Sequence, residues 1–137
     1  MKFTKTFVID TPNVIRYKEH KGPKYVENFL SLTSFINENK SIKFIIIITP
    51  WMEKVLPNLS RFCAKNLVKK YSTDYNNLDP DIAAFEVSKE EECAGLISND
   101  KFRKKIYEPY KREVNEIIKF YIIERKNENL MKCYLPR

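Results

Sequence analysis

Five side chains that can bind a divalent metal ion lie next to short apolar runs of this sequence: Asp10, Asn13, Asp79, Asp81 and Asp100. The first two follow the apolar run 7–9, the last follows the run 94–97, and the middle pair flanks Pro80. Carboxylates gathered in one place repel one another unless a cation neutralises them. Oxygen donors of this kind favour Mg²⁺ or Mn²⁺, and a metal ion held there could activate water and stabilise the charge that develops on phosphorus.

Each of these acids also has a purely structural interpretation. Asp10 can form the turn at a strand end, and Asp79 is a suitable N-cap for a helix that starts at Pro80. The segment 98–100 can cap a helix that follows it. The metal-site hypothesis therefore depends on the acids being brought together by the fold.

The elements that would position these side chains are strands alternating with helices. The runs 7–9, 42–48 and 94–97 are short, continuous and apolar, which is typical of buried strands in a parallel sheet. In such a sheet ligands bind beyond the carboxyl ends of the strands. The polar residues that follow the first and third runs are therefore expected at one edge of the sheet.

Helical periodicity accounts for most of the remaining chain. Helices are predicted over 23–39, over 53–71 with an interruption near Pro57, over 80–93, and along an apolar stripe from 114 to 122. The apolar face of the first helix comprises Val26, Phe29, Leu30 and Ile36. The stretch 72–78 is a predicted loop, and 130–135 is either a short edge strand or a packed tail. This order predicts one α/β domain over residues 1–137, with three α/β/α layers around a mostly parallel sheet.

Composition excludes several classes of function. The two glycines, Gly22 and Gly95, are too far apart to form a phosphate-binding loop or a dinucleotide fingerprint. The three cysteines are widely spaced and His20 is the only histidine, so neither a disulfide framework nor a zinc site is expected. No signal peptide and no membrane-spanning run is evident, so we expect an intracellular protein, cytoplasmic or nuclear, with reduced thiols and no membrane partner.

The net charge of +7 is concentrated in two stretches. Residues 101–112 contain six basic side chains and one acidic side chain, and residues 16–24 contain four and one. Because both stretches follow the acids at the predicted strand ends, they predict a basic cleft around an acidic pocket, which would attract a polyanion. The residues expected to bind it are Arg16, Lys18, Lys21, Lys24, Ser98, Lys101, Arg103, Lys104 and Lys105.

Aromatic side chains are interleaved with these charges: Tyr17, Tyr25, Phe102, Tyr107 and Tyr110. Such rings can stack on unpaired bases, or they can pack in the core and its rim, which is the more frequent role. Trp51, which follows the run 42–48, has the same two interpretations.

Two segments of the chain resemble a known family. Residues 7–14, Phe-Val-Ile-Asp-Thr-Pro-Asn-Val, are similar to the hydrophobic-Asp-x-x-Asn-Val opening of NYN domains, a branch of the PIN-like nucleases. Residues 96–103, Leu-Ile-Ser-Asn-Asp-Lys-Phe-Arg, are similar to the Ser-Asn-Asp-x-aromatic-Arg segment of the Regnase-type ribonucleases. Weaker similarities at 48–51 and 120–136 occur in the same order, so the resemblance extends over nearly the whole chain.

This resemblance implies a PIN-like (NYN) fold and a metal-dependent endoribonuclease that uses Mg²⁺, or Mn²⁺ in its place, on single-stranded or looped RNA. Asp10 and Asp100 would be direct or water-mediated metal ligands, and Asn13 would orient a ligand or a water molecule. The family's middle acidic pair falls on 79–81, where we favour Asp81 as the ligand and keep Asp79 as the alternative. A homodimer or a larger RNA-processing complex is also implied as a possible assembly.

Two departures from the family pattern leave other functions open. Pro12 stands where a small residue is usual, and Lys104 stands where the family often has an acid. A non-catalytic RNA-binding or scaffold module is therefore the alternative to the enzyme, and a protein–protein adaptor is a third possibility.

Overall fold

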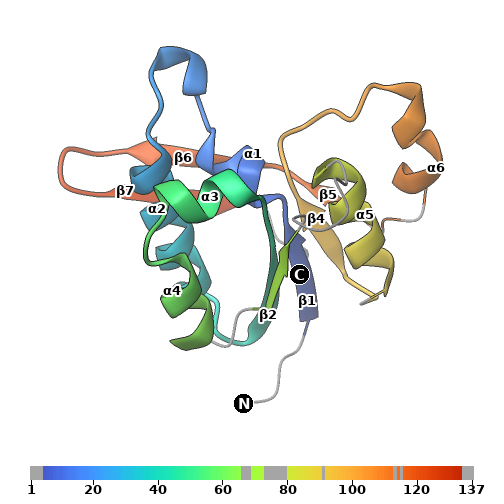
Figure 1. The fold of residues 1–137 in the computed structure, drawn as a ribbon, viewed down its shortest axis with the longest axis horizontal. Coiled ribbons are helices and arrows are strands. Elements are labelled where there is room, and N and C mark those ends of the chain that lie inside the picture. Colours follow the sequence, from blue (N-terminus) through green and yellow to red (C-terminus); the bar gives the residue numbers. More distant parts are fainter. Residues whose placement is uncertain are drawn as a thin grey trace.

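A five-stranded, all-parallel sheet forms the centre of the fold (Figure 1). The computed structural model describes residues 5–65, 69–72, 80–90, 92–112, 114 and 116–133. The strands are β1 (Lys5–Ile9), β2 (Ile42–Ile48), β3 (Lys69–Ser72), β4 (Gly95–Ile97) and β5 (Ile117–Ile118), in the order β3-β2-β1-β4-β5. The predicted strands at 7–9, 42–48 and 94–97 are confirmed, and they are the three central strands of this sheet.

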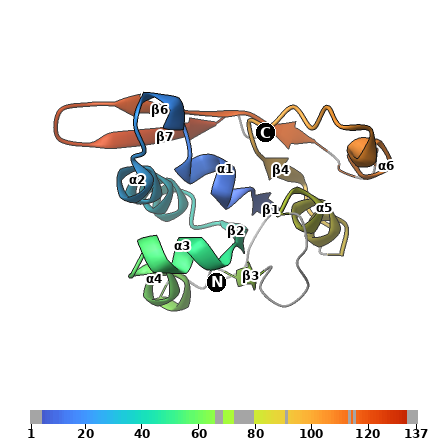
Figure 2. The same cartoon turned by 45° about the horizontal axis from the view of Figure 1, so that its top comes forward.

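Helices lie on both sides of the sheet. They are α1 (Thr11–Ile15), α2 (Tyr25–Glu38), α3 (Pro50–Val55), α4 (Leu59–Lys65), α5 (Pro80–Glu90) and α6 (Glu108–Lys111), with the short 3₁₀ helices η1 (Glu19–Lys21) and η2 (Lys105–Tyr107). Figure 2 shows α2, α3 and α4 on one side of the central strands and α5 and α6 on the other. The structure is therefore a mixed α/β fold with a parallel sheet, in agreement with the predicted class.

Side chains of the central strands alternate between two apolar clusters. In β1, Phe7 and Ile9 pack with the core of α2, whereas Val8 packs with α5. The partners of these residues on the neighbouring strands follow the same alternation, because the strands are paired in register: Phe7 with Phe44, Val8 with Ile45 and Leu96, and Ile9 with Ile46 and Ile97. Each face of the sheet is thus buried under helices, which explains why the runs are apolar without interruption.

The helix predicted along the stripe from 114 to 122 is wrong. Ile117 and Ile118 form β5, and residues 120–133 form an antiparallel hairpin of β6 (Phe120–Glu124) and β7 (Asn129–Cys133). Within β6 the burial alternates, since Phe120 and Ile122 are buried while Tyr121 is exposed. Over so few residues, the same apolar positions fit both the helical and the strand periodicity. Pairing with a neighbouring strand then decides between the two structures. Of the two interpretations of 130–135, the edge strand is confirmed for residues 130–133.

The helix predicted over 53–71 is also only partly correct. The expected interruption near Pro57 is present, because α3 ends at Val55 and α4 begins at Leu59. Residues 69–72, however, are β3, which pairs in register with residues 45–48 of β2. Strand pairing with β2 outweighs the local helical pattern there. Of the predicted loop at 72–78, Ser72 belongs to β3 and the remainder lies outside the described residues.

The buried face of α2 is rotated from the predicted one. Phe29 and Ile36 are buried as expected, but Val26 and Leu30 are 49% and 58% exposed. Their places are taken by other residues of the helix, including the polar Asn28 and Ser31. These polar groups are satisfied by backbone carbonyls: Asn28 Nδ2 donates to Ile15 O (2.7 Å) and Ser31 Oγ donates to Asn129 O (3.1 Å). A search for apolar periodicity misses a face that is held by hydrogen bonds.

Gly95 lies where β4 packs closely against its neighbouring strands. A Cβ atom added there would lie 3.0 Å from Glu116 O, 3.0 Å from the Ile118 side chain and 3.3 Å from the Phe7 ring. The first of these neighbours is backbone, which cannot rotate away. A side chain at this position would therefore push β5 or β1 away from β4.

The cysteines are free thiols, and two of the three are buried. Cys63 and Cys93 are buried, and burial raises the pKa of the Cys133 thiol to about 12. No disulfide joins cysteines of the described chain, which include all three. No helix within the described ranges is long and apolar enough to cross a membrane.

Candidate functional site

The exits of β1 and β4 bring Asp10 and Ser98 together. These strands are adjacent and parallel, so the residues that follow Ile9 and Ile97 lie side by side. Asp10 is 2% exposed, and its Oδ2 accepts a hydrogen bond of 2.7 Å from Ser98 Oγ. The same hydroxyl oxygen accepts a bond of 3.1 Å from the backbone N–H of Asp100. The Ser98 hydroxyl thus links Asp10 to the loop that carries Asp100.

A second link joins Asn13 to the same loop. The backbone N–H of Asn99 donates to Asn13 Oδ1 at 2.8 Å. Because a backbone N–H can only donate, the amide atom that faces it must be the oxygen, which settles the orientation of the Asn13 amide. The Nδ2 group of Asn13 therefore points away from Asn99, and the structure gives it no acceptor among the residues it describes.

Asn99 has a role that sequence reasoning missed. Its Nδ2 donates to Phe120 O and its Oδ1 accepts from Phe120 N, both at 2.9 Å. The side chain therefore imitates a strand pairing and ties the loop after β4 to the start of β6. The signal in the sequence was the amide itself, but its partner is 21 residues away and could only be identified in the fold.

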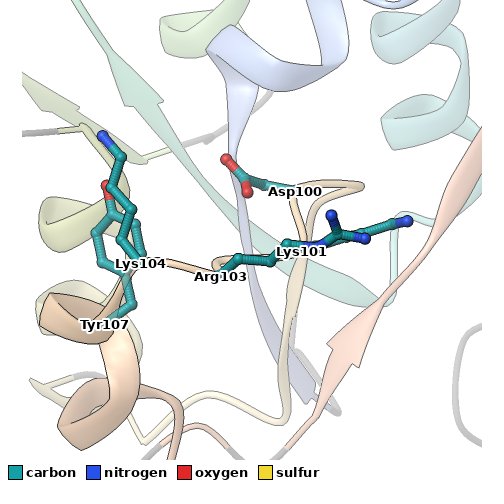
Figure 3. Close-up of a pocket in the computed structure, with 5 residues that line it drawn as sticks. All are labelled: Asp100, Lys101, Arg103, Lys104 and Tyr107. Atoms are coloured by element: carbon teal, nitrogen blue, oxygen red, sulfur yellow. The ribbon is translucent and has the colours of Figure 1, made fainter.

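Asp100 is half-buried and its carboxylate is held by a tight turn. Its Oδ1 accepts a bond of 2.8 Å from the backbone N–H of Phe102, whose φ of 47° lies in the left-handed region. In addition, Lys119 Nζ donates to the backbone oxygen of Asp100 at 3.1 Å. Figure 3 shows that the Asp100 carboxylate points toward the side on which Lys104 and Tyr107 lie.

A pocket of about 440 Å³ adjoins Asp100, and its walls carry mostly positive charge. It is lined by Asp100, Lys101, Arg103, Lys104 and Tyr107 (Figure 3). The three cations have no ion-pair partner within the described part of the chain. Figure 3 shows the Lys101 and Arg103 side chains extending to one side and Lys104 lying on the other. Three basic residues against one carboxylate in the lining make this pocket attractive to a phosphate-bearing ligand.

Of the middle acidic pair, Asp79 and Asp81, the structure describes only the second. Asp79 lies outside the described residues, and Asp81 belongs to the first turn of α5. Since α5 leads into the amino end of β4, it runs antiparallel to the strands and its first turn lies at their carboxyl edge. The backbone of Asp81 is therefore at the same edge of the sheet as Asp10 and Asp100.

The donor set suits a hard divalent cation. Asp10 and Asp100 supply two carboxylates, and Mg²⁺ binds through one or two carboxylates together with water and substrate phosphate. A group of three or more acidic, histidine or cysteine side chains that could hold a metal does not occur within the described ranges. An ion held by these two carboxylates would need water or phosphate for the rest of its shell.

The basic stretch 16–24 is placed differently from 101–105. Arg16 pairs with Glu19 (3.6 Å) and lies 4.6 Å from the Trp51 ring centroid, while Lys24 pairs with Glu124 of β6 (3.7 Å). No residue of this stretch lines the pocket beside Asp100. Lys18 lies over the Tyr17 ring at 5.4 Å, and Lys21 is exposed on η1. Lys105, at the start of η2, is exposed and does not line the pocket.

Most of the interleaved aromatic rings pack against protein. Phe102 and Tyr107 are 1% and 4% exposed and pack around Phe85 with ring centroids 4.7 and 6.1 Å away, so neither offers a face to a base. Tyr110 stacks on the same phenylalanine. The remaining rings meet one another or a charged side chain: Tyr17 with Phe120, and Tyr25 with Trp51. The packing interpretation is correct for Phe102 and Tyr107.

No protein-family model matches the chain, and no curated protein matches it either.

Proposed function

We propose that this protein is a metal-dependent endoribonuclease that hydrolyses phosphodiester bonds of single-stranded or looped RNA. The observation that carries the proposal is the double link between the exits of β1 and β4, Ser98 Oγ to Asp10 Oδ2 (2.7 Å) and Asn99 N to Asn13 Oδ1 (2.8 Å). These bonds hold an acid, an amide and the Asp100 loop at one sheet edge, beside the cationic pocket. A preorganised acidic edge next to cations suits a reaction on a phosphate group.

Within this proposal, Asp10 and Asp100 hold a Mg²⁺ or Mn²⁺ ion, with Asp81 as the favoured third acid and Asp79 as the alternative. When bound, the ion supplies activation of water and stabilises negative charge on phosphorus. Ser98 fixes the Asp10 carboxylate through its 2.7 Å bond, so that the acid is oriented before the ion arrives. The turn at Phe102 does the same for Asp100.

The cationic pocket would hold the substrate by its backbone. Lys101, Arg103 and Lys104 can bind phosphate oxygens, which positions a nucleic acid without reading its sequence. The buried rings of Phe102 and Tyr107 support the segment that carries these cations. The preference for RNA, and for unpaired RNA in particular, comes from the resemblance to the Regnase-type ribonucleases.

Conservative removal of the two acids tests the proposal. Asp10→Asn and Asp100→Asn each keep an oxygen to accept the bond from Ser98 or from Phe102 N–H, so folding is preserved. Each variant should cleave labelled single-stranded RNA at least about 100-fold more slowly, because a metal-binding carboxylate is lost. Chelation of divalent metal should abolish wild-type cleavage, and added Mg²⁺ or Mn²⁺ should restore it.

Glu90→Gln at the far end of α5 is the matched control, because it removes an exposed acid at a distance from the strand exits. Its cleavage rate should equal that of the wild type. Full activity of both Asp→Asn variants, or cleavage that persists in chelator, would overturn the proposal.

A second candidate is a non-catalytic RNA-binding or scaffold module. The observation that favours it is the excess of three cations over one carboxylate in the pocket, which would retain a polyanion with or without hydrolysis. This function predicts salt-sensitive RNA binding with no metal-dependent turnover. The same assay separates the two, since binding and cleavage are scored on one labelled RNA.

A further inference from the structure

Thr49 carries a buried side-chain hydroxyl just beyond the end of β2. The residue is 6% exposed, and Thr49 Oγ1 has no partner among the described residues. A hydroxyl buried in this way loses its hydration without compensation, so such groups are rare unless water or a ligand satisfies them. In the sequence, nothing distinguishes Thr49 from any other threonine ahead of a proline.

The usual local role of such a threonine does not account for this one. Thr49 precedes α3, yet its side chain makes no capping bond. Only its backbone oxygen contributes there, by accepting a 3.0 Å bond from Met52 N–H. The backbone keeps an extended conformation (φ −113°, ψ 158°), so the side-chain alternation of β2 continues through this residue.

Strand register places Thr49 on the same face of the sheet as Asp10, on the neighbouring strand and two residues further along. Ile9 is opposite Ile46, so Asp10 follows at the level of Ile47, and Thr49 lies two residues further along β2. Two residues of a strand span about 7 Å. Ile47 packs on the α5 side of the sheet, and Thr49, two residues on, shares that face. The face also carries Val8 and Leu96, and therefore Asp10 and Ser98 beyond them.

We propose that Thr49 Oγ1 hydrogen-bonds a water molecule of a hydrated divalent cation held at Asp10, which makes it an outer-shell residue of that site. The inference rests on the metal site of the proposed function. A cation is favoured over a phosphate at this point because the neighbouring charge is the buried carboxylate of Asp10, whereas Lys101, Arg103 and Lys104 line the pocket at Asp100. Mg²⁺ keeps several of its waters in proteins, and those waters need acceptors.

Two substitutions separate this role from a structural one. Thr49→Val has nearly the same shape and lacks the hydroxyl, while Thr49→Ser keeps the hydroxyl. Binding of Mn²⁺ alone, without RNA, is followed by electron paramagnetic resonance, and thermal unfolding is measured in chelator. Thr49→Val should bind Mn²⁺ about tenfold more weakly, as expected for loss of an outer-shell partner, and Thr49→Ser should bind like the wild type.

The metal-free stability supplies the second readout. Since the valine buries no unpartnered hydroxyl, Thr49→Val should unfold in chelator at the wild-type temperature or above it. Unchanged Mn²⁺ affinity in Thr49→Val would overturn the inference, and so would a lowered unfolding temperature in chelator. Absence of Mn²⁺ binding in the wild type would overturn both this inference and the metal-dependent function. Mn²⁺ binding without RNA cleavage would overturn the proposed endoribonuclease function and leave the role of Thr49 standing.

Discussion

At the residue scale, Asn13 is the side chain whose chemistry the structure defines most closely. Its Oδ1 is engaged by Asn99 N–H, so the group that it offers to a ligand is Nδ2, a hydrogen-bond donor. A donor at the strand exits suits a phosphate oxygen better than a metal ion. The second lone pair of Oδ1 is the only route by which the amide could still bind a cation.

Asn13→Asp distinguishes these two roles. The aspartate keeps an oxygen for Asn99 N–H, so the loop is retained, but it replaces the donor with a negative charge. We expect RNA affinity, measured in chelator at fixed salt, to fall about tenfold, because a bond to a charged group is lost.

Asn127→Asp in the hairpin loop is the control for this substitution, because it makes the same charge change at an exposed residue between β6 and β7. Its RNA affinity should stay close to the wild-type value. If Asn13→Asp instead left RNA affinity intact and strengthened Mn²⁺ binding, Asn13 would be a metal ligand.

At the element scale, the position of the site depends on how closely β4 approaches its neighbours. Gly95 has no side chain, and this lets Glu116 O accept the backbone bond from Leu96 at 2.8 Å. The strand is only three residues long, so it has few other bonds to hold it. The loop 98–100, which carries Ser98 and Asp100, starts directly from its end.

Gly95→Ala should therefore destabilise the protein and loosen the site together. The added methyl group would meet backbone at 3.0 Å, which corresponds to overpacking with a cost of about 1–3 kcal/mol in the free energy of unfolding. Urea denaturation measures this change. Gly22→Ala, where the space around a Cβ is open but φ is +114°, provides the comparison, with an expected cost of about 1 kcal/mol from backbone strain alone. Equal effects of the two substitutions would show that close packing at β4 is unimportant.

Local pattern predicted some of these elements and failed for others for a physical reason. The central strands are buried on both faces, so their apolar runs are unambiguous, and Pro57 marks the break between α3 and α4. Residues 69–72 and 117–118 become strands because β2 and β4 offer them open edges. An edge of this kind is created by tertiary structure and leaves no trace in the local sequence.

At the scale of the whole molecule, the net charge is +7, and the basic side chains include two groups with different surroundings. One group is paired with acids and the other lines the pocket at Asp100. Arg16 and Lys24 are paired with acids, and their stretch lies away from the pocket at Asp100. Lys101, Arg103 and Lys104 line that pocket and have no acidic partner among the described residues. The second group should therefore carry most of the electrostatic attraction for a polyanion.

The salt dependence of RNA binding tests this division. Replacement of Arg103 and Lys104 by Gln should make the slope of log K against log salt less negative by about 1.4, because two phosphate contacts to a single strand are lost. The control replaces Lys40, ahead of β2, and Lys89, at the end of α5, which lie at the opposite edge of the sheet. An equal change of slope in both double variants would mean that the attraction is diffuse and the pocket is not its centre.

Local sequence patterns were enough to predict the class of the fold, its central strands and the polar residues that follow them. Continuous apolar runs bury both faces of a sheet wherever they pair, so these features do not depend on the rest of the chain. The contacts of those polar residues could be identified only in the folded structure. Ser98 contacts Asp10 at 2.7 Å, and Asn99 fixes the orientation of the Asn13 amide, although the partners are far apart in the sequence. The burial of Thr49 likewise depends on how the chain folds around it. The roles of these residues depend on strand register, which is fixed when the sheet assembles.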